Sequence, residues 1–483
     1  MNTASISGVV FNHRFAAIST YFIQILLKNP LAVTKLPQNP VMKPEINAET
    51  TALLPKSHPP EKAVSRVSSI SGAVFNVSTS MVGAGIMSIP ATLKVLGIIP
   101  GFVVILIMAF LVEVTVEFLL RYTNYSGEAN TYGGVMAESF GKLGSIALQI
   151  CVMVSNLGAL IIYLIIIGDV LSGDQSDGVL HSGILQECFG FHWWNSRAYS
   201  VLFIVVFVML PLLLLPRVES LGHASAISIL LAVVFVVIIS GMAIYAMVEG
   251  VTQELKLVPN FSDGFSFFSL FTTIPVMATA LSCHVTIHPV RAELQNQSDM
   301  RSAVRISLVL SAAIYVAVGF VGYLLFGDSI MADMLVNFDQ TSNSPGGLLV
   351  NAVVRLSYAL HLMLVFPVIF YSLRANMDEM IFARKSVLAN DTTRFVSITC
   401  VLLAFIYFVA IAIPNIWYFF QFMGSTTVAC IAFVFPGAIV LRDVHGISTR
   451  TDRTMAIIVV MLAVVTSIIA ISTNLYSTFG NTS

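Results

Sequence analysis

Long apolar segments separated by short polar ones dominate the chain. A helix needs about 20 consecutive apolar residues to cross the hydrocarbon core of a bilayer. Eleven segments meet this requirement: 71–97, 99–121, 144–170, 198–216, 224–247, 266–288, 303–326, 348–372, 394–414, 416–440 and 454–475. The pattern therefore predicts an all-α integral membrane protein with eleven transmembrane helices.

Composition and charge support a membrane protein and give it an orientation. Hydrophobic residues make up 57% of the 483 residues and charged residues 10%, whereas about a quarter of a soluble domain is charged. Cytoplasmic loops hold an excess of Lys and Arg. Most of the 24 Lys and Arg fall on one side of the predicted spans if the segment before Ser69 is cytosolic. We therefore expect a cytosolic N-terminus, and with a net charge of −1 and no basic patch we expect no nucleic-acid partner.

Two predicted spans, the first and the sixth, are interrupted. The first contains Gly83 and Gly85 around Ala84. The sixth contains Pro275 and then the small and polar residues Ala278, Thr279, Ala280 and Ser282. Small residues also serve close helix packing, and for one span alone that interpretation would prevail. Interruptions at matching positions of two five-helix halves instead indicate a secondary transporter with a 5+5 inverted repeat and one extra helix.

The interruptions favour a particular class of substrate. Unwound backbone at membrane depth is tolerated where it lines a cavity. Amide groups freed near Ala84 and Gly85 would lie at the positive end of a half-helix and suit a carboxylate. Freed carbonyl groups suit an amine or a cation. A zwitterionic amino acid satisfies both.

Five motifs in order carry a resemblance to a known family. They are "VFNVSTSMVGAGIMSIP" from Val74, "TYGGVMAESFG" from Thr131, "IIIGDVL" from Ile165, "CHVTIHPVRAEL" from Cys283 and "GYLLFGD" from Gly322. Together they resemble the amino acid/auxin permease family, especially its sodium-coupled neutral amino acid transporters and their vacuolar relatives. The resemblance runs from about residue 69 to the C-terminus. It implies a discontinuous first and sixth helix that together build the substrate site.

The resemblance also implies site residues. The substrate-binding candidates are Ser80, Gly83, Ala84, Gly85, Thr279, Ala280 and Ser282. Asn76 matches an asparagine linked to sodium in the coupled branch, although a helix-packing amide would have the same sequence signature. The position at which that branch has a hydroxyl before a Val-Pro step is Val365 here, and valine offers no oxygen ligand. We therefore expect coupling to protons, or facilitated exit, rather than coupling to sodium.

Ionisable residues inside spans are costly and suggest function. Glu113 and His284 are the candidates for proton handling, whereas Glu117 lies nearer a span end. His284 could equally hydrogen-bond the unwound backbone. Arg355 is expected to pair with an acid such as Asp169. No cluster of His, Cys or carboxylates has metal-ligand spacing, so we expect no metal and no cofactor.

The N-terminal segment has its own signals. Residues 1–68 read as a disordered cytosolic tail before a transporter domain at 69–483. "ETTALL" contains Glu49, Leu53 and Leu54 and resembles an acidic dileucine sorting signal for vacuolar or lysosomal membranes.

Two further features of this segment leave alternatives open. "SISGVVFN" at Ser5 nearly repeats "SISGAVFN" at Ser69, through partial duplication or coincidence. The apolar stretch 15–27 is too short to span and predicts an interfacial helix or disorder.

Two functions follow from the pattern. The first is a secondary active transporter of amino acids, neutral ones or a broader range. Its partners are the amino acid, a proton (with sodium as the alternative) and membrane lipid. The second is an amino acid sensor that keeps the pocket and signals through the tail. An intramembrane aspartyl protease needs two carboxylates facing each other at depth. Asp169 and Asp328 both lie near span ends, so we expect no enzyme activity.

Overall fold

The computed structural model describes the chain from Ser69 onward with short gaps. The described residues are 69–126, 130–176, 179–214, 222–259, 264–339, 345–382 and 391–480. The chain divides into Met1–Val67 and Ser68–Ser483, and every described residue belongs to the second unit. The predicted tail, the "ETTALL" signal, the stretch 15–27 and the first octapeptide copy lie outside the described residues and stay predictions.

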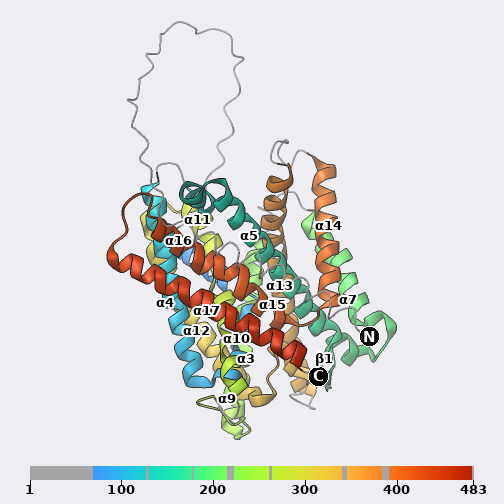
Figure 1. Ribbon diagram of the computed structural model, residues 1–483. Helices are drawn as coiled ribbons and strands as arrows, with labels where there is room; N and C mark the ends of the chain where they lie inside the picture. The colour runs from blue at the N-terminus through green and yellow to red at the C-terminus, as the bar shows by residue number, and fades with distance from the viewer. Residues whose placement is uncertain are drawn as a thin grey trace, which may run out of the picture. The chain divides into compact units, whose positions relative to one another are not determined.

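Helices make up almost all of the described chain (Figure 1). The α-helices are α2 Ile70–Met81, α3 Gly85–Leu96, α4 Ile98–Tyr125, α5 Tyr132–Ser172, α6 Ile184–Phe189, α7 Arg197–Ile204, α8 Leu210–Leu213, α9 Gly222–Glu249, α10 Gly264–Leu281, α11 His284–Glu293, α12 Met300–Phe326, α13 Pro345–Phe382, α14 Thr392–Ala412, α15 Ile416–Met423, α16 Phe435–Arg442 and α17 Arg450–Gly480. Short 3₁₀ turns are η1 Trp193–Asn195, η4 Gln297–Asp299, η5 Gly327–Ser329 and η6 Met334–Asp339. Three π-helical turns are η2 Val205–Met209, η8 Gly424–Val428 and η9 Cys430–Val434. The two strands, β1 Asp174–Ser176 and β2 Val179–His181, form an antiparallel hairpin.

The helices confirm the all-α membrane fold. Among the described residues, nine helices are long and apolar enough to cross a membrane. The pair α2 and α3, bent by 59°, makes a tenth. The predicted fourth span corresponds to the shorter apolar helix Arg197–Leu213.

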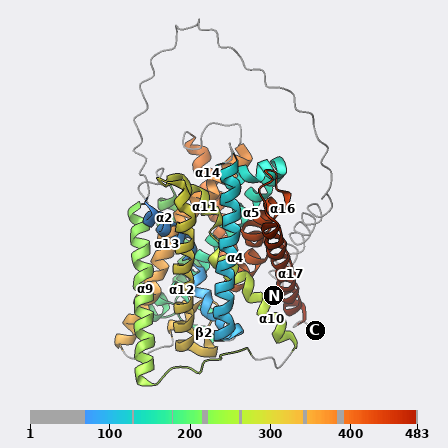
Figure 2. The same ribbon diagram turned by 90° about the vertical axis from the view of Figure 1, so that its left-hand side faces the viewer.

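The first and sixth spans are both broken, as predicted. The first span is interrupted between α2 and α3, and the sixth at Ser282 and Cys283, between α10 and α11. α2 packs against α11, α3 packs against α10, and α12 contacts both halves of the first span. Figure 2 shows α2 and α11 towards one end of the helix bundle and α10 towards the other. The two broken spans therefore run in opposite directions and meet at their breaks.

Ion pairs gather at the end of the bundle where α2 begins, which we call the basic end. Arg121 pairs with Asp452, and Arg453 pairs with Asp443. Arg301 pairs with Glu117 at the same end. We call the opposite end, which carries β1 and β2, the hairpin end.

Asp443 anchors the turn between α16 and α17 at the basic end. Its φ of 46° is left-handed, a conformation that Asp and Asn tolerate better than most residues. Burial alone would raise the pKa of this carboxyl. Hydrogen bonds from Tyr122 and Arg453 and from the amides of Ser448 and Ile447 outweigh burial and lower the pKa to about 2.

The tenth span departs from a regular helix in a way that the sequence pattern did not predict. Two π-helical turns, η8 and η9, separate α15 from α16. Gly424 begins η8 and lies against the backbone of Pro275 in α10, where a Cβ at Gly424 would overlap the Pro275 carbonyl. At this position the tenth span meets the backbone of the sixth span without an intervening side chain.

Candidate functional site

The break in the first span leaves carbonyl groups that the helix cannot satisfy. In a continuous helix the Met81 carbonyl would accept from the amide of Gly85, four residues later. Instead it accepts from the Gly83 N–H, with an N···O distance of 2.8 Å. The Gly83 carbonyl accepts from the Ile86 N–H at 3.2 Å. The chain therefore passes from α2 to α3 through a tight turn.

Three tyrosines from three other spans surround this turn. The Tyr358 hydroxyl of α13 donates to the Gly83 carbonyl at 2.6 Å. The Tyr315 hydroxyl of α12 lies 2.6 Å from the Met81 carbonyl oxygen. Tyr163 of α5 faces the same turn, because its hydroxyl lies 2.9 Å from the position of a Cβ on Gly83. The polar groups of the break thus have phenol partners at membrane depth.

The apolar pattern of the chain does not mark these tyrosines as site residues, but their position within the spans does. Tyrosine in membrane proteins concentrates at the interfaces, where its hydroxyl meets water. Tyr163, Tyr315 and Tyr358 are instead buried inside their spans. A tyrosine in the middle of an apolar span needs a hydrogen-bond partner, and unwound backbone supplies one.

The two breaks touch each other. A Cβ on Gly85 would lie 2.8 Å from the Ala280 Cβ and 3.0 Å from the Ala280 Cα. Real carbon atoms do not approach so closely, so only glycine fits at position 85. The structure thus brings together Gly83, Ala84, Gly85 and Ala280, four of the seven predicted substrate residues.

The other predicted substrate residues lie next to the two breaks. The Thr279 hydroxyl donates to the Pro275 carbonyl at 2.9 Å. Ser282 is half-buried in the break itself. Ser80, in the last turn of α2, donates to the Val77 carbonyl at 2.7 Å and lies 3.1 Å from the Thr286 hydroxyl of α11. The seven candidates therefore occupy one neighbourhood.

α2 exposes a polar face. Asn76 and Ser80 are four residues apart, so they share this face, and both are exposed. Polar side chains exposed within a span are typical of a water-filled path rather than a lipid contact. The face runs from the break towards the basic end.

Hydrogen bonds connect α3 to the segment before η6 at the hairpin end. The Ser88 hydroxyl of α3 donates to the Ala332 carbonyl at 2.8 Å, and Lys94 donates to the Ile330 carbonyl at 3.3 Å. These bonds hold the segment before η6 over α3. That segment covers the hairpin-end side of α3, whereas the polar face of α2 is exposed towards the basic end.

The two proton candidates have different surroundings. Glu113 is partly exposed and forms an ion pair with Arg305, with an N···O distance of 2.7 Å. Its carboxylate therefore already has an arginine partner, which weakens its candidacy. His284 is fully buried directly after the sixth-span break, and its Nε2 lies 2.9 Å from the Thr115 hydroxyl. Its other ring nitrogen, Nδ1, has no hydrogen-bond partner among the described residues.

The expected pairing of Arg355 with Asp169 is wrong. Arg355 forms an ion pair with Glu187 of α6 at 2.5 Å and donates to the Ser182 carbonyl at 2.9 Å. Asp169 instead pairs with Arg197 at the start of α7. The loop between the third and fourth spans folds back over α13 and supplies the acid, which a count of charges inside spans could not foresee.

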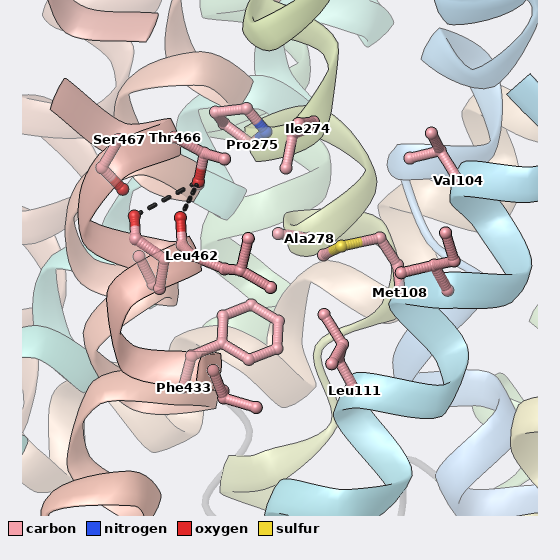
Figure 3. Close-up of a pocket in the computed structure, with 15 residues that line it drawn as sticks. Val104, Met108, Leu111, Ile274, Pro275, Ala278, Phe433, Leu462, Thr466 and Ser467 are labelled. Atoms are coloured by element: carbon pink, nitrogen blue, oxygen red, sulfur yellow. Dashed lines mark hydrogen bonds between the residues drawn. The ribbon is translucent and has the colours of Figure 1, made fainter. Parts of the chain in front are cut away.

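A cavity of about 200 Å³ lies apart from the breaks, between α4, α10, α17 and the π-helical turns (Figure 3). Its lining is almost wholly apolar and includes Met108, Pro275, Ala278 and Phe433. The Thr466 hydroxyl at its edge already bonds the carbonyl oxygens of its own helix, as the dashed lines in Figure 3 mark. A zwitterion buried there would lack partners for both charges, so this cavity is not the substrate site.

Known proteins match the chain over most of its length. A family model described as "Transmembrane amino acid transporter protein" matches residues 66–477. Amino acid transporter AVT6C of Arabidopsis thaliana is 55% identical over 440 residues, which cover 91% of this chain and 100% of that protein. Amino acid transporter AVT6A of the same plant is 44% identical, over 88% of this chain and 93% of that protein.

More distant matches agree in fold and class. Sodium-coupled neutral amino acid symporter 2 of Danio rerio is 24% identical over 86% of this chain and 85% of that protein. The crystal structure of MhsT in complex with L-phenylalanine superposes with a TM-score of 0.51 at 12% identity, over 84% of this chain and 99% of that chain. This likeness establishes the shared fold. These findings favour a transporter over both an enzyme and a sensor. The chain belongs to the family of transmembrane amino acid transporter proteins.

Proposed function

We propose that the protein carries neutral amino acids across its membrane and binds them at the paired breaks. The observation that carries this proposal is the contact between Gly85 and Ala280, where two interrupted spans meet. Amides at the start of α3 suit the substrate carboxylate, and carbonyls at the end of α2 and α10 suit its ammonium group. The seven predicted pocket residues are all uncharged. A charged substrate side chain would therefore be buried without a partner, which favours neutral substrates.

Coupling to protons, or facilitated movement, follows from the residues near the site. A sodium ion needs several oxygen ligands, and Val365 offers none where sodium-coupled relatives are expected to have a hydroxyl. Asn76, the remaining sodium candidate, is exposed on α2. His284 is the better proton candidate, because it is buried beside the sixth-span break and one ring nitrogen is without a partner there.

The membrane and the orientation are part of the proposal. The basic end carries Arg121, Arg301 and Arg453 and is assigned to the cytosol, since cytosolic surfaces are enriched in arginine and lysine. The "ETTALL" sequence and the resemblance to vacuolar amino acid transporters support a vacuolar or lysosomal membrane.

Uptake by purified protein in liposomes tests function and coupling together. A panel of radiolabelled neutral amino acids is offered first at fixed pH with sodium replaced by choline, and then at fixed sodium with the pH gradient stepped. We expect uptake of at least one amino acid that persists in choline. If protons are coupled, the initial rate rises with an inward proton gradient. If movement is facilitated, the rate ignores that gradient.

Two results would contradict the proposal at different levels. If the liposomes take up none of the amino acids, the proposal that the protein transports neutral amino acids is wrong. If uptake requires sodium and does not respond to pH, the proposed coupling is wrong, but the proposed transport of neutral amino acids stands. Val365→Thr provides the matched variant, and sodium stimulation that appears only in this variant would support the ligand argument.

A further inference from the structure

Tyr315 of α12 contacts both broken spans with one hydroxyl group. Its side chain is fully buried. The hydroxyl oxygen lies 2.6 Å from the Met81 carbonyl oxygen and 2.8 Å from the Ala280 carbonyl oxygen. Met81 ends α2 in the first span, whereas Ala280 lies in the last turn of α10 in the sixth span. Residues from opposite halves of the repeat therefore share one phenol.

Both carbonyls lack their ordinary helical partner. The amide four residues after Met81 belongs to Gly85, and the amide four residues after Ala280 belongs to His284. Each of these amides lies beyond a break, in the next helix. The Tyr315 hydroxyl is therefore the donor available to carbonyls that would accept from backbone amides in continuous helices.

A hydroxyl has one proton, so it donates to only one carbonyl at a time. When Ala280 receives the proton, the Met81 carbonyl still accepts from the Gly83 amide at 2.8 Å. When Met81 receives the proton, the Ala280 carbonyl oxygen lies 2.8 Å from the hydroxyl oxygen and accepts once the hydroxyl rotates. Rotation about the C–O bond exchanges one hydrogen bond for the other without breaking the O–H bond.

Packing divides the two carbonyls between two units. α2 packs on α11, and α3 packs on α10. Ala280 is held to α3 by its contact with Gly85, at 2.8 Å from the position of a Cβ there. Met81 belongs to the α2 and α11 pair, so the Tyr315 hydroxyl lies within hydrogen-bond distance of one carbonyl from each pair.

We propose that Tyr315 is a positioning residue that acts as a transferable latch between the two units during transport. When the α2 and α11 unit tilts away, the phenol keeps its bond to Ala280. When the α3 and α10 unit tilts away, it keeps its bond to Met81. The phenol thus remains paired on both sides of the conformational change, which keeps the barrier between them low. This inference rests on the proposed function, transport of an amino acid through the paired breaks.

Tyr315→Phe in liposomes tests the latch, with Tyr323→Phe as the matched control. Tyr323 lies two turns further along α12 and is also fully buried, but its hydroxyl faces Lys256 and Asp328 at the hairpin end. The probe is the labelled neutral amino acid that gives the highest uptake by the unsubstituted protein. We expect Tyr315→Phe to lower the maximal rate at least tenfold while KM and equilibrium binding of the probe change less than threefold. Tyr323→Phe should keep the maximal rate within twofold.

The split between rate and binding separates a latch from other roles. A Tyr315→Phe protein with an unchanged maximal rate would overturn the latch. Binding that falls in step with the rate would also overturn it, because that pattern indicates a substrate contact or a structural defect. Failure of the unsubstituted protein to move any amino acid would overturn the proposed function, and the latch with it.

A second variant keeps the test decisive if Tyr315→Phe does not insert. Incorporation of 3-fluorotyrosine at position 315 retains the ring and the hydroxyl but makes the hydroxyl a stronger donor. The latch predicts a several-fold lower maximal rate with unchanged binding of the same probe, because each exchange must break a stronger bond. A maximal rate equal to that of the unsubstituted protein would overturn the latch.

Discussion

The contact between Gly85 and Ala280 leaves no room for a larger side chain where the two broken spans meet. At Gly85 the obstructing atoms include the Cα of Ala280, which is backbone and cannot rotate away. At Gly83 the obstructing atom is the hydroxyl oxygen of Tyr163, which sits at the end of a side chain. Substitution should therefore be worse tolerated at position 85 than at position 83.

We expect Gly85→Ala to lower the initial rate of amino acid uptake at least tenfold and Gly83→Ala to lower it less. The reason is that the added methyl group forces the two breaks apart at position 85, whereas at position 83 Tyr163 can yield. Uptake into liposomes measures the rate, and fluorescence size-exclusion chromatography reports whether each variant is folded.

Gly241→Ala is the matched control for this pair. It adds the same methyl group to α9 at a position with open space around it. Its uptake should equal that of the unsubstituted protein. Equal rates for Gly85→Ala and Gly241→Ala would show that the contact at the breaks is not needed for transport.

The predictability of the site differs from residue to residue. Gly83 and Gly85 could be predicted because a break inside an apolar span leaves a local mark in the sequence. Tyr315 and Tyr358 reach the break from helices more than 200 residues away along the chain. Their role depends on which spans pack together, and the pattern of apolar residues does not determine the packing partners.

Among the elements, the turn between α16 and α17 is the one with the clearest electrostatic basis. Hydrogen bonds from Tyr122 and Arg453 stabilise the charged form of Asp443, so its pKa is about 2. An unfolded chain has an Asp pKa of about 3.9. A depressed pKa adds stability above the unfolded value, and this contribution disappears as the pH falls through the folded value.

Asp443→Asn should therefore destabilise the protein by about 1.5–3 kcal/mol at neutral pH, the range for hydrogen bonds to a charged group. Asparagine also tolerates the left-handed backbone, so the substitution removes charge rather than introducing strain. The difference in melting temperature between the two proteins in detergent should be constant from about pH 7 to pH 5 and shrink between about pH 4 and pH 2.

Glu293→Gln serves as the control for the pH series, because Glu293 is exposed at the end of α11. This variant should melt with the unsubstituted protein at every pH. A melting difference for Asp443→Asn that does not depend on pH would contradict the assignment of the effect to the carboxylate.

Elements differ in how far the sequence determines them. The breaks of the first and sixth spans were predictable because glycine, proline and small polar residues interrupt an apolar run. The π-helical turns η8 and η9 were missed, although Gly424 and the polar residues 425–427 interrupt the tenth apolar run, because such residues also fit a regular helix that packs closely. The kink of α5 at Gly141, with φ 68°, lies just before the predicted third span, 144–170, so the apolar pattern did not cover it.

At the scale of the whole molecule, the transporter and its destination are separate problems. The proposed binding site lies within the described residues from Ser69 onward, whereas the predicted sorting signal lies before them. The position of such a signal in the fold does not matter, since a receptor reads it as a short extended peptide.

Replacing Leu53 and Leu54 with alanine should move a fluorescent fusion from an internal acidic compartment to the cell surface. Transport by the purified variant should be unchanged, because the substitution leaves the paired breaks intact. Confocal imaging with a surface-biotinylation assay measures the distribution. Leu26 and Leu27 form a second leucine pair that no acid precedes at the same spacing, so their replacement is the control. If both double variants have the same distribution, "ETTALL" is not a sorting signal and its pattern arose by chance.

The backbone contact between Gly424 and Pro275 has a mechanical consequence. Where side chains separate two helices, an applied load can be absorbed by rotamer changes before the helices part. Here no side chain intervenes, because a Cβ at Gly424 would overlap the Pro275 carbonyl. A pull on the C-terminus would first peel away α17, whose apolar span is only 22% buried. It would then reach this close contact, where position 424 has no rotamer to change, so we expect the tenth span and α10 to part together rather than one after the other.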